Sequence, residues 1–219
     1  MLVSIIISCS LAGLSSSIHA QSPQITSGLS WLTANQVQNG AWQGVSTTDL
    51  HSTTEVLSSL AVLGNKDVSY NNGPTWFSSQ TINTTDCLAR RISILGSSYS
   101  PSDLSTLLSY QYSDGGFGGY LEYTGNNLDT TLSLLALKSA NYSDSTVITN
   151  AISYLLSNQN ADGGFGFYTG DVSNVYMTAL VSSTLQQFQQ TTSIATAVNK
   201  ATTYLLAHQN TDGGFGSSP

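Results

Sequence analysis

The stretch QNADGGFGFY, which begins at Gln159, decides the fold because near-copies of it occur elsewhere in the chain. QYSDGGFGGY begins at Gln111 and QNTDGGFGSS begins at Gln209, so the three glutamines lie 48 and 50 residues apart. A period near 50 residues indicates an array of repeated supersecondary units. A divergent copy, QVQNGAW, begins at Gln36, and TWFSSQ ends at Gln80 without a Gly-rich continuation. Five glutamines therefore mark five units.

The segments on either side of these glutamines have the apolar spacing of helices. DSTVITNAISYLLSNQ, residues 144–159, places its apolar residues on one face, whereas DTTLSLLALKSA, residues 129–140, is apolar on most sides. An amphipathic helix belongs on the outside of a fold and an apolar one inside it. Each unit is therefore predicted to be an outer helix, Gln, a Gly-rich turn and an inner helix, in an all-α fold. The first inner helix is predicted over residues 53–64, with His51 ahead of it.

The Gly-rich turn is interpreted as a structural brace. No Lys follows any copy, which excludes a phosphate-binding loop, and the acidic residues lack the spacing of calcium loops. Asp can bond to the backbone of the turn, Gly allows a positive φ, the aromatic ring can pack between helices, and the Gln amide can satisfy exposed carbonyls. The predicted structural residues are Gln111, Asp114, Gly115, Gly116, Phe117, Gln159, Asp162, Gly163, Gly164, Phe165, Gln209, Asp212, Gly213, Gly214 and Phe215.

Composition and the N-terminal segment point to an exported protein. Residues 1–20 carry no charge and contain a short apolar run that ends at Ala20, which predicts a cleaved signal peptide ahead of a domain over residues 21–219. No membrane-spanning segment is predicted after cleavage. The net charge of −7 argues against nucleic-acid binding. The predicted location is secreted or cell surface.

The repeats resemble those of terpene cyclases, squalene cyclase among them, and of protein prenyltransferase β subunits. The resemblance rests on the Gln, Asp-Gly-Gly-aromatic-Gly and inner-helix pattern, which is closest over residues 111–137 and 159–180. It implies an α/α toroid, in which inner and outer helices form concentric rings around a cavity. Five outer segments are followed by only four inner ones, so the toroid is predicted to be incomplete in this chain.

The resemblance also indicates where a reaction centre would lie. The cyclases use an Asp-x-Asp-Asp cluster to protonate an alkene, and this chain has no such cluster. Its candidates for a catalytic carboxyl are Asp129 and Asp86 at inner-helix starts, where Asp also favours helix capping. The prenyltransferases hold zinc through Asp, Cys and His, and the weak candidates here are Asp86, Cys87 and His51. Because adjacent helical residues point about 100° apart, Asp86 and Cys87 converge poorly on one metal.

Two functions from different classes remain open at this point. The first is an exported, non-catalytic toroid that binds a ligand or serves as a scaffold through its cavity or rim. Its partner would be a hydrophobic small molecule or an extracellular protein, and no cofactor is predicted. The second is a cyclase or prenyltransferase relative whose acidic or zinc site lies largely beyond Pro219.

Overall fold

The computed structural model describes residues 22–44 and 48–216, and the predicted signal peptide lies outside this part of the chain. Outer and inner helices alternate along the described sequence. The outer helices are α1 (Pro23–Ala34), α3 (Val68–Ser78), α5 (Pro101–Ser109), α7 (Ser145–Ser157) and α9 (Thr192–Ala207). The inner helices are α2 (Asp49–Val62), α4 (Thr85–Leu95), which runs on into the short η1 (Gly96–Ser98), α6 (Asn127–Ser139) and α8 (Val175–Leu185).

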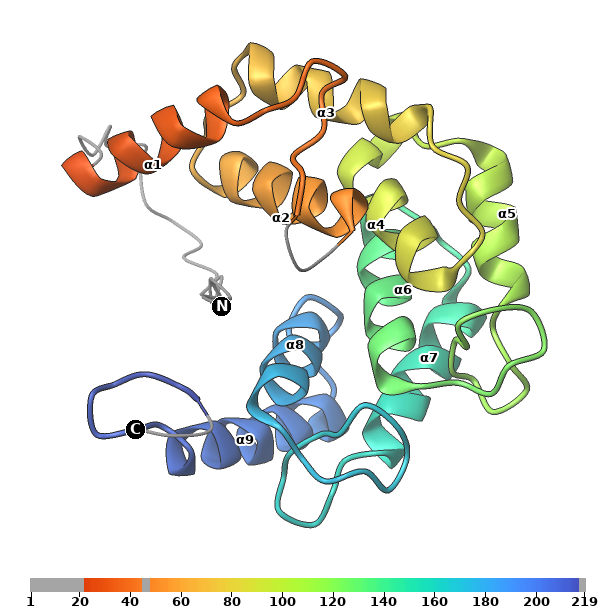
Figure 1. Cartoon of the computed structure of the whole chain (residues 1–219). Helices are drawn as coiled ribbons and strands as arrows, with labels where there is room; N and C mark the ends of the chain where they lie inside the picture. The colour runs from red at the N-terminus through yellow and green to blue at the C-terminus, as the bar shows by residue number, and fades with distance from the viewer. Residues whose placement is uncertain (1–21, 45–47, 217–219) are drawn as a thin grey trace.

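The helices form two concentric arcs (Figure 1). Along the inner arc α2 contacts α4, α4 contacts α6, and α6 contacts α8, while each inner helix also packs on the outer helix that follows it. The arc is open on the side that separates α1 from the end of α9. Over the described residues this confirms the predicted all-α architecture. None of the described helices is long and apolar enough to cross a membrane.

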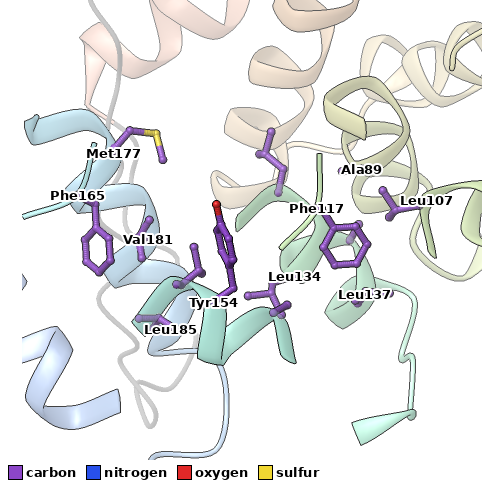
Figure 2. Packing of buried hydrophobic residues seen from close by; sticks show 14 of the residues in the cluster. Ala89, Leu107, Phe117, Leu134, Leu137, Tyr154, Phe165, Met177, Val181 and Leu185 are labelled. Atoms are coloured by element: carbon purple, nitrogen blue, oxygen red, sulfur yellow. The ribbon is translucent and has the colours of Figure 1, made fainter. Parts of the chain in front are cut away.

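The core consists of two clusters of buried side chains. The smaller surrounds Trp42, Leu57 and Phe77, and the larger extends from α4 to α9. Phe117 and Phe165 are completely buried in the larger cluster, and their rings point into it on either side of Tyr154 (Figure 2). Phe117 and Phe165 therefore pack between helices, whereas Phe215 of the last copy is 40% exposed.

The motif turns have the predicted local structure. In the copy at Gln159, Asp162 accepts a hydrogen bond from the backbone N–H of Gly164 at 2.9 Å. Gly163 has a φ of +87°, and a Cβ on it would meet the carbonyl oxygen of Lys200 at 2.6 Å. Both the positive φ and this close approach to α9 require glycine at this position.

The Gln amide joins one outer helix to the next. Its Nε2 donates one hydrogen bond to the turn that follows its own helix and a second to a backbone carbonyl of the next outer helix. The pairs of acceptors are Gly40 and Ser69 for Gln36 (both 2.8 Å), Gly115 and Val147 for Gln111 (3.0 and 2.9 Å), and Gly163 and Ala197 for Gln159 (2.9 and 2.8 Å). The motif is therefore the link between successive units.

The unit that lacks a Gly-rich turn is joined differently. Gln80 donates only to its own neighbours, Trp76 and Ser79. Arg91 of α4 instead donates to the carbonyl of Gln80 at 2.5 Å and to Asp103 of α5 at 2.6 Å. The side chains of Arg91 and Asp103 are only 9% and 10% exposed. A buried ion pair thus links α3 to α5 where the motif is missing.

We expect Gln159→Ala to lower the free energy of unfolding by roughly 2–3 kcal/mol. The variant loses two hydrogen bonds and leaves carbonyls without a donor. Gln209→Ala is the matched control, because within the described part of the chain Gln209 donates only to Gly213 of its own turn. Its effect should stay below about 1 kcal/mol. Urea unfolding followed by circular dichroism measures both, and equal losses would contradict the role of the bond between helices.

Asp103→Ala should cost about 3–5 kcal/mol, because it leaves the buried Arg91 charge without its partner. The double variant Arg91→Met, Asp103→Leu should recover most of this loss, since it removes both charges from the core. Thermal or urea unfolding of the two variants provides the comparison. A double variant that is less stable than Asp103→Ala would show that the ion pair itself contributes the stability.

Candidate functional site

The inner helices share a register that is fixed by hydrogen bonds to the motif turns. In three of them a threonine Oγ1 accepts from the backbone N–H of the motif aromatic residue at 2.9 Å. These anchor threonines are Thr53 (from Trp42), Thr130 (from Phe117) and Thr178 (from Phe165). Helix α4 has no threonine at this position. Thr85 of α4 and Asn127 of α6 make matching bonds to the next motif turn along the chain, so these two residues are equivalent. The anchor Thr130 lies three residues after Asn127, and its equivalent in α4 is therefore Leu88.

The positions two residues before and two residues after the anchor form the candidate site, which we call the inner ring. The first set is His51, Asp86, Leu128 and Tyr176, and the second is Glu55, Arg90, Leu132 and Leu180. Members from α2 and α4 are charged or titratable, whereas those from α6 and α8 are apolar or aromatic. The inner ring therefore has a polar half and an apolar half.

The polar half is an ion-pair network between α2 and α4. Asp86 contacts His51 Nε2 at 2.5 Å through one carboxylate oxygen and accepts from Arg90 Nε at 2.6 Å through the other. Arg90 Nη1 lies 2.9 Å from Glu55 Oε1. Burial works against the Arg90 charge, but Asp86 and Glu55 outweigh it and raise the pKa of the guanidinium. Arg90 thus remains charged and keeps both carboxylates paired.

The apolar half includes an aromatic pair at the edge of α8. Tyr176 stacks on Phe167 of the preceding loop with ring centroids 6.3 Å apart and the planes inclined by 28°. Burial raises the pKa of the Tyr176 hydroxyl, and the positive charge of Arg90 partly opposes this shift. Arg90 therefore acts electrostatically on α8 as well as on α2. Leu132, at the same register on α6, is 8% exposed.

Asp129 lies one residue away from the inner ring and is almost buried. It accepts from Asn126 Nδ2 at 2.5 Å, and its own N–H donates to Asn126 Oδ1 at 2.8 Å. The capping residue is therefore Asn126, and Asp129 is its reciprocal partner. Burial raises the pKa of Asp129, and the nearby charge of Asp86 adds to the increase. The equivalent residue of α8 is the fully buried Met177, so Asp129 is a carboxyl at an apolar position.

The candidate zinc ligands are only partly brought together. His51 and Asp86 are in contact, but the neighbouring Cys87 packs against the core cluster around Trp42. Burial raises the pKa of the Cys87 thiol and disfavours the thiolate that binds zinc. Within residues 22–44 and 48–216, no three His, Cys, Asp or Glu side chains are arranged to hold a metal ion.

Two details of the site differ from the sequence interpretation. His51 was expected ahead of the first inner helix, but α2 begins at Asp49 because Thr48 caps it, so His51 lies in the first turn. The Glu55–Arg90 pair was not predicted, since the two residues are 35 positions apart in sequence. Glu55 lies two residues after the anchor Thr53, and Arg90 lies two residues after Leu88, the equivalent of the anchor in α4. The shared register of the inner helices therefore identifies both residues of the pair.

The comparisons with known proteins agree with this architecture. The family model of the prenyltransferase alpha-alpha toroid domain matches residues 69–219. The chain belongs to this family. A search of curated proteins gave no match.

Solved structures of similar fold include a protein from Actinoplanes (TM-score 0.70, 16% identity, covering 87% of this chain and 66% of that one). The type II terpene cyclase MstE from Scytonema matches with a TM-score of 0.71 and 18% identity, over 89% of this chain and 64% of that one. ent-Copalyl diphosphate synthase from Streptomyces platensis has a TM-score of 0.63 and 18% identity, over 83% and 39%. The chain thus spans about two thirds or less of each, and the likeness establishes the toroid fold.

Asp129→Asn should stabilise the toroid more at neutral than at acidic pH. Because the pKa of Asp129 is raised in the folded state, the stability from its protonated form is complete below the unfolded value of about 4. That stability is lost as the pH rises through the folded pKa. We therefore expect the difference in unfolding free energy, variant minus parent, to increase from about pH 4 to pH 7. Urea unfolding at several pH values measures it, and a constant difference would contradict the assignment.

Proposed function

We propose that this toroid binds an apolar small molecule of the isoprenoid class along its inner arc and does so without catalysing its cyclisation. The hydrocarbon would lie against the apolar half of the inner ring, on Leu128, Leu180 and Tyr176. A polar end would face the ion-pair network of α2 and α4. With the predicted signal peptide, we further propose that the protein acts outside the cell, as a secreted or surface-held binding or scaffold module.

The observation that carries the proposal is the pairing of both carboxylates of the inner ring. A cyclase of this fold must donate a proton to an alkene, which requires a carboxyl that keeps its proton. Asp86 lies between His51 and Arg90, and Glu55 also pairs with Arg90. Both carboxylate oxygens of Asp86 and one of Glu55 are therefore engaged by side chains of the protein, so neither carboxyl group is free to approach an alkene.

The apolar half of the inner ring is the reason for proposing a hydrocarbon ligand. Tyr176 is 36% exposed and stacked on Phe167, so a hydrocarbon that covers it removes aromatic surface from water. Solved structures of MstE variants hold geranylgeranyl dihydroxybenzoate as substrate and merosterolic acid A as product. A chain with one apolar tail and one polar end matches the two halves of the inner ring.

One observation favours a second function, that of a type II cyclase with Asp129 as the acid. Asp129 has a raised pKa and lies within electrostatic reach of Asp86, as expected for a carboxyl that holds a proton beside a carboxylate. In that reaction Asp129 would protonate the terminal alkene and a later carbocation would lose a proton. The reaction is redox-neutral and requires no further reactant.

Binding and turnover can be measured separately on the full chain. We expect geranylgeraniol to bind in a calorimetric titration and to be recovered unchanged. Tyr176→Ala should weaken binding about tenfold or more, through the lost aromatic burial. Tyr112→Ala, an exposed tyrosine of a motif turn, is the matched control and should leave binding intact.

Three outcomes would overturn the proposal. Cyclic products, detected by gas chromatography with mass spectrometry and abolished in Asp129→Asn, would establish the cyclase function in its place. Absence of geranylgeraniol binding, or equal weakening of it by Tyr176→Ala and Tyr112→Ala, would remove the inner ring as an isoprenoid site.

A further inference from the structure

The loops over residues 118–126 and 166–174 occupy equivalent places in successive units, one before α6 and the other before α8. We call them the α6 loop and the α8 loop. In the α6 loop a turn is closed by a hydrogen bond from the N–H of Tyr123 to the carbonyl of Tyr120 at 3.2 Å. The corresponding bond of the α8 loop, 48 residues further along the chain, measures 3.1 Å. The two loops therefore share one backbone turn and can be compared residue by residue.

The third residue of this turn differs between the two loops. It is Gly170 in the α8 loop, with a φ of +83°, and Glu122 in the α6 loop, with a φ of +67°. Glycine adopts a positive φ without cost, whereas a residue with a long side chain is strained there. Because glycine makes the same turn in the next unit, the fold does not require Glu122, and Glu122 lowers the stability of its own loop.

The fourth residue of the turn differs as well. In the α8 loop it is Asp171, whose Oδ2 accepts a hydrogen bond from the N–H of Tyr168 at 3.0 Å and so closes the turn a second time. Tyr123 takes this place in the α6 loop, and the second bond is absent from the described structure. Both differences thus remove a stabilising feature of the turn, which is the pattern expected where a site serves binding at the expense of the fold.

Together the two differences create a tip of two aromatic rings and a carboxylate. The ring centroids of Tyr120 and Tyr123 are 5.8 Å apart and the planes are inclined by 57°. The two residues are 46% and 63% exposed, and Glu122 between them is exposed too. Within the described part of the chain the Glu122 carboxylate makes no hydrogen bond or ion pair. The tip therefore presents its aromatic and acidic groups to solvent.

The base of the α6 loop is held by helices on both sides. The N–H of Gly125 donates to Asp114 at 3.3 Å, and the Tyr154 hydroxyl of α7 donates to the carbonyl of Gly125 at 2.5 Å. On the other side the N–H of Thr85 in α4 donates to the carbonyl of Gly119 at 3.1 Å. The loop projects from the helical arc between α5 and α6 (Figure 1). A tip on so fixed a base needs little ordering when it binds a partner.

We propose that the tip formed by Tyr120, Glu122 and Tyr123 binds an arginine side chain of a partner protein. The planar guanidinium stacks on the tyrosine rings through a cation–π contact and donates to the carboxylate of Glu122. The proposal uses no residue of the inner ring, so it is independent of the proposed ligand.

Charge and shape both favour this partner. The sequence contains no basic residue between Arg91 and Lys138, so the units beside the loop bring no cation of their own from this stretch, and the whole chain has a net charge of −7. Small molecules bind in concave sites, whereas this tip projects from the arc. The cation is therefore assigned to a protein side chain and not to a free small molecule.

Nuclear magnetic resonance of the full chain with labelled tyrosine tests the proposal. The probe is the peptide acetyl-Gly-Arg-Gly-amide, and the same peptide with Gln in place of Arg is the reference. We expect the Arg peptide to shift the ring resonances of Tyr120 and Tyr123 in a saturable way, and the Gln peptide to leave them unchanged. Glu122→Gln and Tyr123→Ala should each raise the dissociation constant of the Arg peptide at least about threefold.

Two matched controls separate this site from general attraction to an acidic protein. Tyr168→Ala removes a tyrosine from the equivalent turn of the α8 loop, and Tyr168 is also 63% exposed. Asp67→Asn removes one exposed negative charge elsewhere, and Asn still caps α3. Both variants should bind the Arg peptide like the parent protein.

Glu122→Gly separates the binding role of Glu122 from any structural role. Glycine relieves the strain of the positive φ, so we expect urea unfolding to show a higher midpoint while the Arg peptide binds at least about threefold more weakly. Glu122→Gln keeps the strained backbone and removes only the charge, so it should lose binding without the gain in midpoint.

Four results would overturn the proposal. The first is an Arg peptide that leaves both ring resonances unshifted. The second is tetramethylammonium binding at the tip more tightly than the peptide, which would assign the site to a free small cation. The third is equal weakening in the control variants, and the fourth is Glu122→Gly binding the peptide as tightly as the parent.

Discussion

The structure depends on a single side-chain amide that makes two hydrogen bonds at once. A helix end leaves backbone carbonyls without donors, and the glutamines that follow α1, α5 and α7 each donate to their own turn and to a carbonyl of the next outer helix. A neutral amide has the two N–H groups that this requires and avoids the desolvation cost of a buried charge. Each inner helix packs on the outer helix that follows it, and the bonds of the glutamines set the spacing of successive outer helices. The arc in Figure 1 follows from the repetition of the contact.

The unit that lacks the two-bond glutamine shows what these hydrogen bonds contribute to the fold. After α3 the Gly-rich turn is missing, and the Arg91 guanidinium reaches from α4 to Gln80 and Asp103. It performs the same connection with a charged donor, and the charge requires Asp103 as a buried partner. Such a pair adds little net stability over apolar residues but penalises any arrangement that separates its members. One unit therefore diverged in sequence while the order of the outer helices was preserved by a different interaction.

The sequence predicts the repeated parts of this protein well, because a period near 50 residues and the motif spacing report backbone requirements. The helices, the turns, the buried aromatic rings and the Asp bonds of the turns all follow from them. The second bond of each Gln could not be predicted, since its acceptor is a backbone carbonyl that any residue provides. His51 was misplaced relative to its helix because Thr48, and no apolar residue, sets the start of α2. Asp129 was expected to cap α6, but Asn126 three residues earlier has the stronger cap geometry.

Whether a residue of the repeat serves the fold or the function depends on which atoms its side chain contacts. Gln, Gly, the motif aromatic and the anchor threonine contact the backbone or core of a neighbouring unit, so a change at any of them disturbs two units. The inner-ring positions lie two residues on either side of the anchor, and those on α2 and α4 contact each other's side chains. They can therefore diverge from unit to unit, and they have, from His51 and Asp86 to Leu128 and Tyr176. The difference between the two halves of the ring is the part of this molecule that the fold does not require, and it is where we place the specificity.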